Sequence, residues 1–229
     1  KQRIDQAITR VLSNQGSNGA FGLWYPDSGD LWLDSYVSDF LSRARAQGYA
    51  VPDLAFEQAL GNLRNRVNYA ADFEKGGEDV AYALMVLARE GYAAIGDLRY
   101  YADTRSGAFA TALAQAQLGA ALASYGDQSR ADRMFRLAGA RLGAGATSQG
   151  GRSAYGAGLR GRAAVLSLAV DAGSDAVDRV ALAEQVSRAP VARRSTQENM
   201  WSLMAVKALV QNGGADGISL NGAPMTAPL

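Results

Sequence analysis

The most constraining feature of the sequence is an alternation between two kinds of apolar helical segment. Residues 128–142 carry a single apolar stripe with arginines beside it, whereas residues 78–89 are apolar around almost the whole circumference. A helix with one stripe needs cover on one side, but a helix that is apolar all round has to be covered on every side. The two kinds therefore predict outer and inner helices packed in concentric layers.

This alternation continues along most of the chain, with helix starts about 20 to 25 residues apart. Outer-type segments are residues 1–14, 52–67, 95–103, 128–142 and a more polar helix that we expect Ser174 to cap and Pro190 to close. Inner-type segments are the helix after Asp30, residues 78–89, 107–125 and 159–172, and a last helix that Ser195 or Thr196 caps, with Glu198 placed to complete a capping box. An open solenoid would give every helix similar burial. We therefore predict an all-α fold, an α/α toroid with about five hairpins present and one pair missing from the usual ring of about six.

An aromatic loop rich in glycine leads into the first inner helix. Phe21, Trp24 and Tyr25 supply apolar mass that a surface loop does not need, so we expect the loop to fold down onto the domain. Asp30 is placed to cap the helix, and Asp34 falls in its first turn, where the helix dipole favours anions. The loop and the helix are therefore expected to dock as a unit.

The pattern changes near the C-terminus, after Gly213 and Gly214. Apolar residues then alternate on both sides of an Asn-Gly pair at positions 221–222, a strong signal for a β-hairpin. We therefore divide the chain into a helical toroid over residues 1–213 and the start of an adjoining β domain over residues 214–229.

Composition excludes several classes of function. The chain has 229 residues with a formal net charge of +1 and no basic run, which argues against nucleic acid as a partner. It contains no cysteine and no histidine, so thiol and imidazole nucleophiles, imidazole bases and the usual zinc ligands are missing. No apolar stretch approaches the roughly 20 residues that span a bilayer, so we expect no direct membrane insertion. We assign no catalytic, cofactor-binding or metal-binding residue.

Carboxylates are the strongest candidates for chemistry. Four of them could form an acidic cluster for glycoside hydrolysis or for a diphosphate held through magnesium: Asp27, Asp30, Asp34 and Asp39. We favour a structural interpretation, because capping and first-turn placement explain two of the four. The pair at positions 78–79, Glu78 and Asp79, is explained in the same way by helix initiation after two glycines.

Three further features have a functional and a structural interpretation. Arg188, Arg193 and Arg194 could contact an anionic partner, but a solvated loop is the favoured interpretation of so short a cluster. The glycine-rich loop from Gln149 to Tyr155 could be an interaction surface, and nothing in its residues prefers that to a plain connection.

The three tryptophans are the last of these features. Trp24, Trp32 and Trp201 could line a pocket. Their positions in helices and in a docked loop favour the hydrophobic core instead, because large aromatic side chains contribute most when they are buried.

Three segments of the chain resemble the thioester domain of bacterial α2-macroglobulin-like proteins. They are RIDQAITRVLSNQGSNGAFGLWYPDSG, the following WLDSYVSDFLSRARAQGYAVP and the late RRSTQENMWSLMAVKAL. The resemblance extends from Ile4 to about Val210. It implies an α/α toroid of the terpenoid cyclase-like kind inserted into a β domain, which suits the expected hairpin at the C-terminus.

The resemblance also implies a function. Such proteins are broad-spectrum inhibitors that trap proteases by a conformational change, so we expect a binding module and no enzyme. The implied partners are proteases, bound through the full-length protein, and adjoining β domains of the same chain. The implied location is the bacterial periplasm, with anchoring to the inner membrane through the full-length protein left open.

Two questions stay open at this point. The family's thioester lies in a Cys-Leu-Glu-Gln motif that no position here matches, so either the chain begins downstream of it or the parent protein lacks that cysteine. From the residues alone, the alternative function is an α/α-toroid enzyme of the glycosidase or cyclase kind. Such an enzyme would need at least two carboxylates converging in a central cavity.

Overall fold

The computed structural model describes residues 2–26, 30–70, 73–144, 157–190, 194–212, 219–220 and 223–224. The helices are α1 (Gln2–Leu12), α2 (Leu31–Ala46), α3 (Asp53–Asn68), α4 (Glu78–Arg89), α5 (Ile95–Thr104), α6 (Ala112–Ser124), α7 (Gln128–Gly143), α8 (Ala157–Asp171), α9 (Arg179–Ser187) and α10 (Thr196–Asn212). Two short strands follow, β1 (Ser219–Leu220) and β2 (Ala223–Pro224). The predicted all-α class is therefore confirmed for the described residues.

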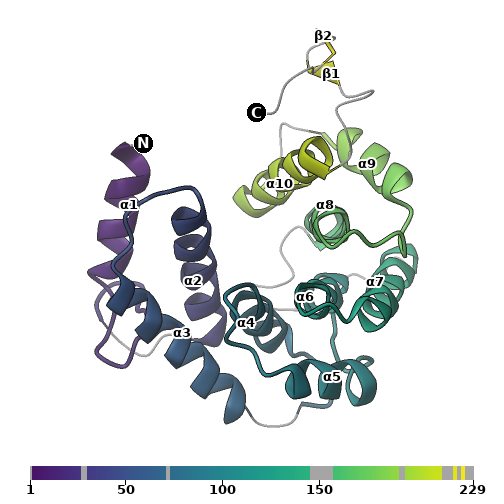
Figure 1. Ribbon diagram of the computed structural model, residues 1–229. Coiled ribbons are helices and arrows are strands. Elements are labelled where there is room, and N and C mark those ends of the chain that lie inside the picture. Colours follow the sequence, from purple (N-terminus) through teal and green to yellow (C-terminus); the bar gives the residue numbers. More distant parts are fainter. Residues whose placement is uncertain are drawn as a thin grey trace.

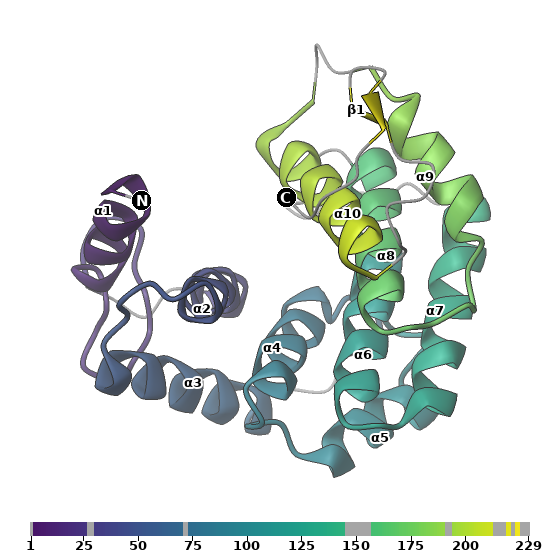
Figure 2. The same cartoon turned by 45° about the horizontal axis from the view of Figure 1, so that its top comes forward.

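The even-numbered helices form an inner arc, and the odd-numbered helices lie outside it (Figure 1). Along the arc α2 packs against α4, α4 against α6, α6 against α8 and α8 against α10. Figures 1 and 2 both show that the arc is not closed, since α10 lies well apart from α1 and α2. The described helices thus make five outer and inner pairs of an α/α toroid, as predicted from the alternation.

Burial follows the predicted difference between inner and outer helices. In the inner helix α4 every residue from Val80 to Ala88 is buried. The outer helix α7 buries a single stripe, Ala131, Met134, Phe135 and Ala138. Since the inner helices face neighbours on several sides and the outer ones on only one, the apolar pattern and the packing agree.

A backbone tie between two loops explains why α6 begins later than the predicted Gly107. Gly76, just before α4, donates its N–H to the carbonyl of Ala108 (3.0 Å) and accepts from the N–H of Ala110 (3.1 Å). The fully buried Phe109 lies between these two hydrogen bonds. The helix then starts behind Thr111, whose side chain accepts from the N–H of Ala114 (3.1 Å).

The caps of other helices test the sequence signals directly. The capping box is confirmed, because the N–H of Ser195 donates to Glu198 Oε2 (2.8 Å) and the N–H of Glu198 to Ser195 Oγ (3.3 Å). The prediction that Ser174 caps α9 is wrong. Asp178 caps that helix by accepting from the N–H of Ala181 (2.9 Å), and Ser174 donates its hydroxyl to Asp132 of α7 (2.6 Å).

The aromatic loop docks only through its first half. Gly19 has φ +83°, and a Cβ there would lie 2.1 Å from the carbonyl oxygen of Gln58 in α3. Phe21 is 1% exposed, as expected, but Trp24 and Tyr25 are 86% and 64% exposed. The expectation that Trp24 and Tyr25 would fold down is wrong, and Phe21 is the ring of the three that the core buries.

Near the C-terminus the predicted hairpin is confirmed where it is described. β1 and β2 are antiparallel, with Ser219 opposite Pro224 and Leu220 opposite Ala223. The Asn-Gly pair at 221–222 lies outside the described residues, and the division at residue 213 stays a prediction. Within the described ranges no helix is both long and apolar enough to cross a membrane.

Candidate functional site

The first turns of the inner helices converge on one small pocket of about 30 Å³ at the centre of the arc. We name it the axial pocket. Its lining comes from helices that are far apart in sequence: Trp32, Glu78, Tyr82, Thr111, Leu113, Gln117, Arg160, Gln197 and Trp201. The five inner helices therefore point the same way, because each contributes residues from its beginning.

Electrostatics distinguish this pocket from an ordinary gap in the core. Helix N-termini carry a positive partial charge, which favours the first-turn carboxylates Glu78 and Glu198. Arg160 of α8 is only 7% exposed. Burial lowers its pKa, and the charges of Glu198 and Glu78 oppose that effect. The pocket is thus polar and charged, although apolar residues surround it.

Two of the three tryptophans belong to this site. Trp201 is 2% exposed, and the half-buried Trp32 stacks on Tyr36 with ring centroids 5.2 Å apart. Trp201 belongs to the hydrophobic core and Trp32 packs against it, as we favoured from the sequence, and both also line the axial pocket. Trp24 is exposed and lines neither the core nor the pocket.

Asp34 has a structural role that the sequence did not indicate. It is fully buried and accepts from the N–H of Phe21, from Nδ2 of Asn62 and from Nη1 of Arg66, each at 2.8 Å. It therefore fastens the aromatic loop to α2 and α3. The predicted cap at Asp30 is confirmed, since its Oδ1 accepts from the N–H of Leu33 (2.7 Å).

Asp39 is also held by structural partners. It accepts from Tyr82 Oη (3.0 Å), from Arg43 Nε (2.9 Å) and from Arg89. Burial raises the pKa of this carboxyl, but the two guanidinium groups outweigh burial and the pKa is lowered overall. Burial and the neighbouring Asp39 raise the pKa of Tyr82 well above its usual value. The fourth aspartate of the proposed cluster, Asp27, lies outside the described residues.

The carboxylates that could have supported catalysis do not converge. Glu78 and Asp79 occupy the first turn of α4, as predicted from helix initiation, and Asp79 Oδ1 accepts from the N–H of Val80 (2.9 Å). Glu78 is the one carboxylate among the described residues of the axial pocket. Among the described residues no group of three or more His, Cys, Asp or Glu is placed to hold a metal ion. The arrangement suits binding or packing better than acid–base chemistry with two carboxyls.

The prediction of a solvated arginine loop holds for Arg188 and fails for Arg194. Arg188 forms an exposed ion pair with Glu184 (3.1 Å). Arg194 donates to the carbonyls of Val186 (3.2 Å) and Ala189 (2.6 Å), so it closes the C-terminal end of α9 and is not part of a solvated loop. Arg193 and the loop from Gln149 to Tyr155 lie outside the described residues.

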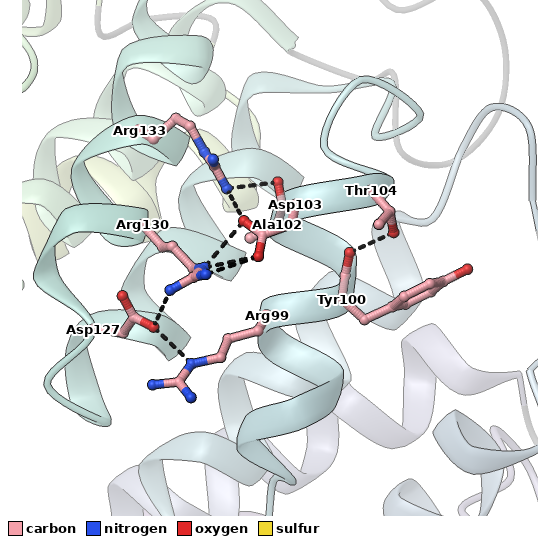
Figure 3. Close-up of polar contacts among 8 residues, drawn as sticks. All are labelled: Arg99, Tyr100, Ala102, Asp103, Thr104, Asp127, Arg130 and Arg133. Atoms are coloured by element: carbon pink, nitrogen blue, oxygen red, sulfur yellow. Dashed lines mark hydrogen bonds and ion pairs between the residues drawn. The ribbon is translucent and has the colours of Figure 1, made fainter.

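A second charged cluster joins the outer helices α5 and α7 (Figure 3). Asp103 pairs with Arg130 (2.9 Å) and Arg133 (2.5 Å), while Asp127 pairs with Arg99 (2.9 Å) and Arg130 (3.1 Å). Hydrogen bonds from the two arginines lower the pKa of Asp103 to about 2. This outer ion network lies on the outside of the arc, so it staples two helices and does not contribute to the axial pocket.

Sequence reasoning missed Arg160, the most unusual residue of the axial pocket. A signal was present, because Arg160 and Arg162 are the only charged residues between Leu159 and Val170 in an otherwise apolar inner segment. A charge at the start of a helix that is covered on all sides must either reach solvent or find partners inside.

Fold and site together define a toroid of α/α hairpins whose parallel inner helices begin around a small charged pocket. No protein-family model matches the chain. Its sequence is 38% identical to the alpha-2-macroglobulin of Escherichia coli K12 over 145 residues, which is 59% of this chain and 9% of that protein.

Solved structures extend this likeness to nearly the whole chain. The native E. coli alpha-2-macroglobulin, from domain MG7 to the C-terminus, superposes with a TM-score of 0.74 at 29% identity, covering 90% of this chain and 34% of that one. Trypsin-activated E. coli alpha-2-macroglobulin gives 0.72 at 30% identity, covering 90% and 15%. The chain belongs to the bacterial alpha-2-macroglobulin-like proteins and corresponds to a helical part of their C-terminal region. It spans about a tenth of the length of the E. coli relative.

Proposed function

We propose that this chain is the helical toroid of a bacterial protease inhibitor that acts by conformational trapping. The observation that carries the proposal is the match to alpha-2-macroglobulin over 90% of the chain, in a native and in a trypsin-activated structure. In this proposal proteases bind the full-length protein and the toroid itself has no enzymatic activity. Its contacts are with adjoining β domains of the same chain, in the periplasm.

The open arc supports a role as one part of a larger protein. The last inner helix, α10, packs on α8 but exposes Leu203 by 67% and Val206 by 37%. A further helical pair between α10 and α2 would cover these side chains and complete the ring. In the family such a pair would carry the Cys-Leu-Glu-Gln thioester, so the proposal includes covalent capture only if the parent protein has that motif.

Trapping can be separated from ordinary active-site inhibition. The full-length protein is mixed with trypsin, and cleavage of casein is compared with cleavage of a small chromogenic peptide. A trap shields the protease from large substrates and leaves its active site open, so casein cleavage should fall strongly while peptide cleavage persists. Equal loss of both activities, or no loss of either, would contradict the proposal.

The thioester and the location each have their own test. If the full-length protein carries a Cys and a Gln in the segment before Arg3, mass spectrometry should show incorporation of methylamine with release of one free thiol. If that segment lacks the cysteine, no incorporation is expected and trapping proceeds without covalent capture.

Fractionation of the native host should find the full-length protein in the periplasmic or inner-membrane fraction, and recovery in the cytosolic fraction would contradict that location.

The enzyme alternative has weaker support. It required two carboxylates that converge in a central cavity, and Asp34 and Asp39 are instead held by buried structural partners. A double variant Glu78→Gln, Asp79→Asn should therefore leave any protease trapping by the full-length protein unchanged within about twofold. The variant loses only the small stabilisation that two first-turn carboxylates give to the N-terminus of α4.

A further inference from the structure

Two buried glutamines on α6 differ in whether the protein satisfies their side chains. Gln115 is 2% exposed, and its amide donates to the carbonyl of Ser106 (3.2 Å) and accepts from Nε of Arg141 (3.2 Å). Gln117 is 3% exposed and lines the axial pocket, but its amide makes no hydrogen bond with any residue that the structure describes. A buried amide without partners lowers stability, so Gln117 is a candidate for binding something in the pocket.

Trp201 of α10 adds a second buried group of this kind. It is 2% exposed and lines the same pocket, and within the described ranges its indole N–H has no acceptor. Neither the indole nitrogen nor the amide of Gln117 is completely enclosed by protein atoms. Because both residues are buried and line the pocket, these groups face the space inside it.

The rest of the lining supplies one more donor and a strong acceptor. The hydroxyl of Thr111 accepts from the N–H of Ala114 (3.1 Å) and keeps its own hydrogen for donation. The carboxylate of Glu78 is half-buried and accepts no hydrogen bond from the described part of the chain. The pocket therefore offers both donors and acceptors to a ligand.

Charge and size restrict that ligand further. The charged side chains among the described lining are one anion, Glu78, and one cation, Arg160, so the charges balance and favour a neutral ligand. The volume is about 30 Å³, and one water molecule needs about 10 to 15 Å³. The pocket thus has room for about two groups of the size of water.

A primary carboxamide matches these restrictions. Its oxygen and its NH₂ group are two such groups on one carbon, the first an acceptor and the second a donor. A carboxylate has the same shape but offers only acceptors, and an amidinium offers only donors. The carboxamide is the neutral member of the three and the one that satisfies both kinds of group in the lining.

We propose that the axial pocket binds a primary carboxamide, either a small free amide or the end of an Asn or Gln side chain. The carboxamide oxygen accepts from the indole N–H of Trp201, and its NH₂ group donates to the carboxylate of Glu78. The amide of Gln117, which has a donor and an acceptor, completes the pairing. This assignment does not depend on the proposed protease trapping, because every lining residue named belongs to the 229-residue chain.

The test compares three probes that share one shape: acetamide, acetate and acetamidinium. Each is titrated into the 229-residue chain at neutral pH, and the indole N–H signal of Trp201 is followed by NMR. NMR suits probes with so few atoms, which bind only in about the millimolar range. The signal is assigned by its loss in Trp201→Phe, and the exposed Trp24 serves as the internal control.

Acetamide should shift the Trp201 signal in a saturable way and leave the Trp24 signal unchanged. Acetate and acetamidinium should bind at least about 10-fold more weakly, because each leaves a buried group of the pocket unpaired. Absence of a saturable shift with acetamide overturns the proposal. Equal or tighter binding of acetate or acetamidinium also overturns it, since the pocket would then be an anion or a cation site.

The two glutamines of α6 provide matched variants. Gln117→Met keeps the size of the side chain and removes the amide, so acetamide should bind at least about 10-fold more weakly while the melting temperature stays the same or rises. Gln115→Met should lower the melting temperature, because it loses two hydrogen bonds, and should bind acetamide like the parent chain. If Gln117→Met binds acetamide like the parent, the proposal is wrong. If that variant does not fold, the three probes in the parent chain decide the question.

The full-length protein distinguishes a free amide from a side chain as the ligand. Saturation-transfer NMR on the methyl protons of acetamide is compared between that protein and its Gln117→Met variant. If the pocket is open to free amides, the signal should be stronger in the parent protein than in the variant. If a side chain of another domain already occupies it, the two signals should be equal, although acetamide binds the 229-residue chain.

Discussion

Inner helices in the middle and at the end of the arc have similar apolar patterns but different surroundings. In α4 the run Val80–Ala88 is buried without interruption, since α2 and α6 flank it and α3 covers it. In α10, which is also apolar on most sides, Leu203 and Val206 are exposed and α8 is the main inner neighbour. The comparison teaches that all-round apolarity alone does not fix how many neighbours a helix has among the described residues.

The largest expected effect is in the outer layer at the middle of the arc. Phe135 of α7 is fully buried, and its ring lies 3.1 Å from the place where a Cβ on Gly119 would be. Phe135→Ala should lower the free energy of unfolding by about 3 to 5 kcal/mol, because it removes a large side chain and leaves a cavity. Leu137→Ala, at a site 36% exposed on the same helix, should cost about 1 kcal/mol or less. Urea unfolding measures both, and a loss below about 1 kcal/mol for Phe135→Ala would contradict the packing of α7.

A matched pair of leucines compares the middle with the end directly. Leu84 of α4 is 1% exposed and Leu203 of α10 is 67% exposed. Leu84→Ala should cost about 2 to 5 kcal/mol, whereas Leu203→Ala in the 229-residue chain should change stability by about 0.5 kcal/mol or less. The same two variants in the full-length protein sharpen the test. A larger cost for Leu203→Ala there would show that α10 gains a neighbour, and similar costs for both leucines in the short chain would break the comparison.

The outer ion network gives a smaller effect that depends on pH. Hydrogen bonds from Arg130 and Arg133 lower the pKa of Asp103 from 3.8 to about 2. A lowered pKa stabilises the folded chain above about pH 4, and this contribution is lost as the pH falls through about 2. Asp103→Asn should therefore melt at a lower temperature than the parent at pH 6, with the difference shrinking toward zero below pH 2. Calorimetry across this range measures it, and a difference that does not depend on pH would exclude this origin.

The smallest expected effect is at the exposed end of the aromatic loop. Trp24 is 86% exposed, so Trp24→Ala should change the free energy of unfolding of the 229-residue chain by about 0.5 kcal/mol or less. Phe21→Ala, three positions earlier and 1% exposed, should cost about 3 to 5 kcal/mol. Comparable losses in both variants would mean that the loop docks along its whole length.

Most of the fold follows from the sequence because hydrophobic periodicity depends on local residues. The apolar run of α4, the stripe of α7 and the capping box at Ser195 all act within one helix, and each was predictable. The predictions that failed depend on contacts between segments distant in sequence. Of the aromatic loop the core buries Phe21 and leaves Trp24 exposed, and Ser174 hydrogen-bonds to Asp132 of α7 instead of capping α9.

The sites were less predictable than the fold, for the same reason. The axial pocket takes one or two residues from each of five helices, and no spacing in the sequence brings Glu78 near Arg160. Likewise Asp39 looked like a member of an acidic cluster, although its partners Tyr82 and Arg89 follow more than forty residues later. Only the order of helices around the arc brings these groups together.

The tie between Gly76 and residues 108–110 has a mechanical consequence. Its two backbone hydrogen bonds lock the loops before α4 and α6 to each other, so these neighbours cannot swing apart at that end without rupturing both. If surrounding domains change the curvature of the arc, we expect the packing between α4 and α6 to stay fixed, because both hydrogen bonds would otherwise have to break. Bending will then concentrate at the joints on either side, between α2 and α4 and beyond α6.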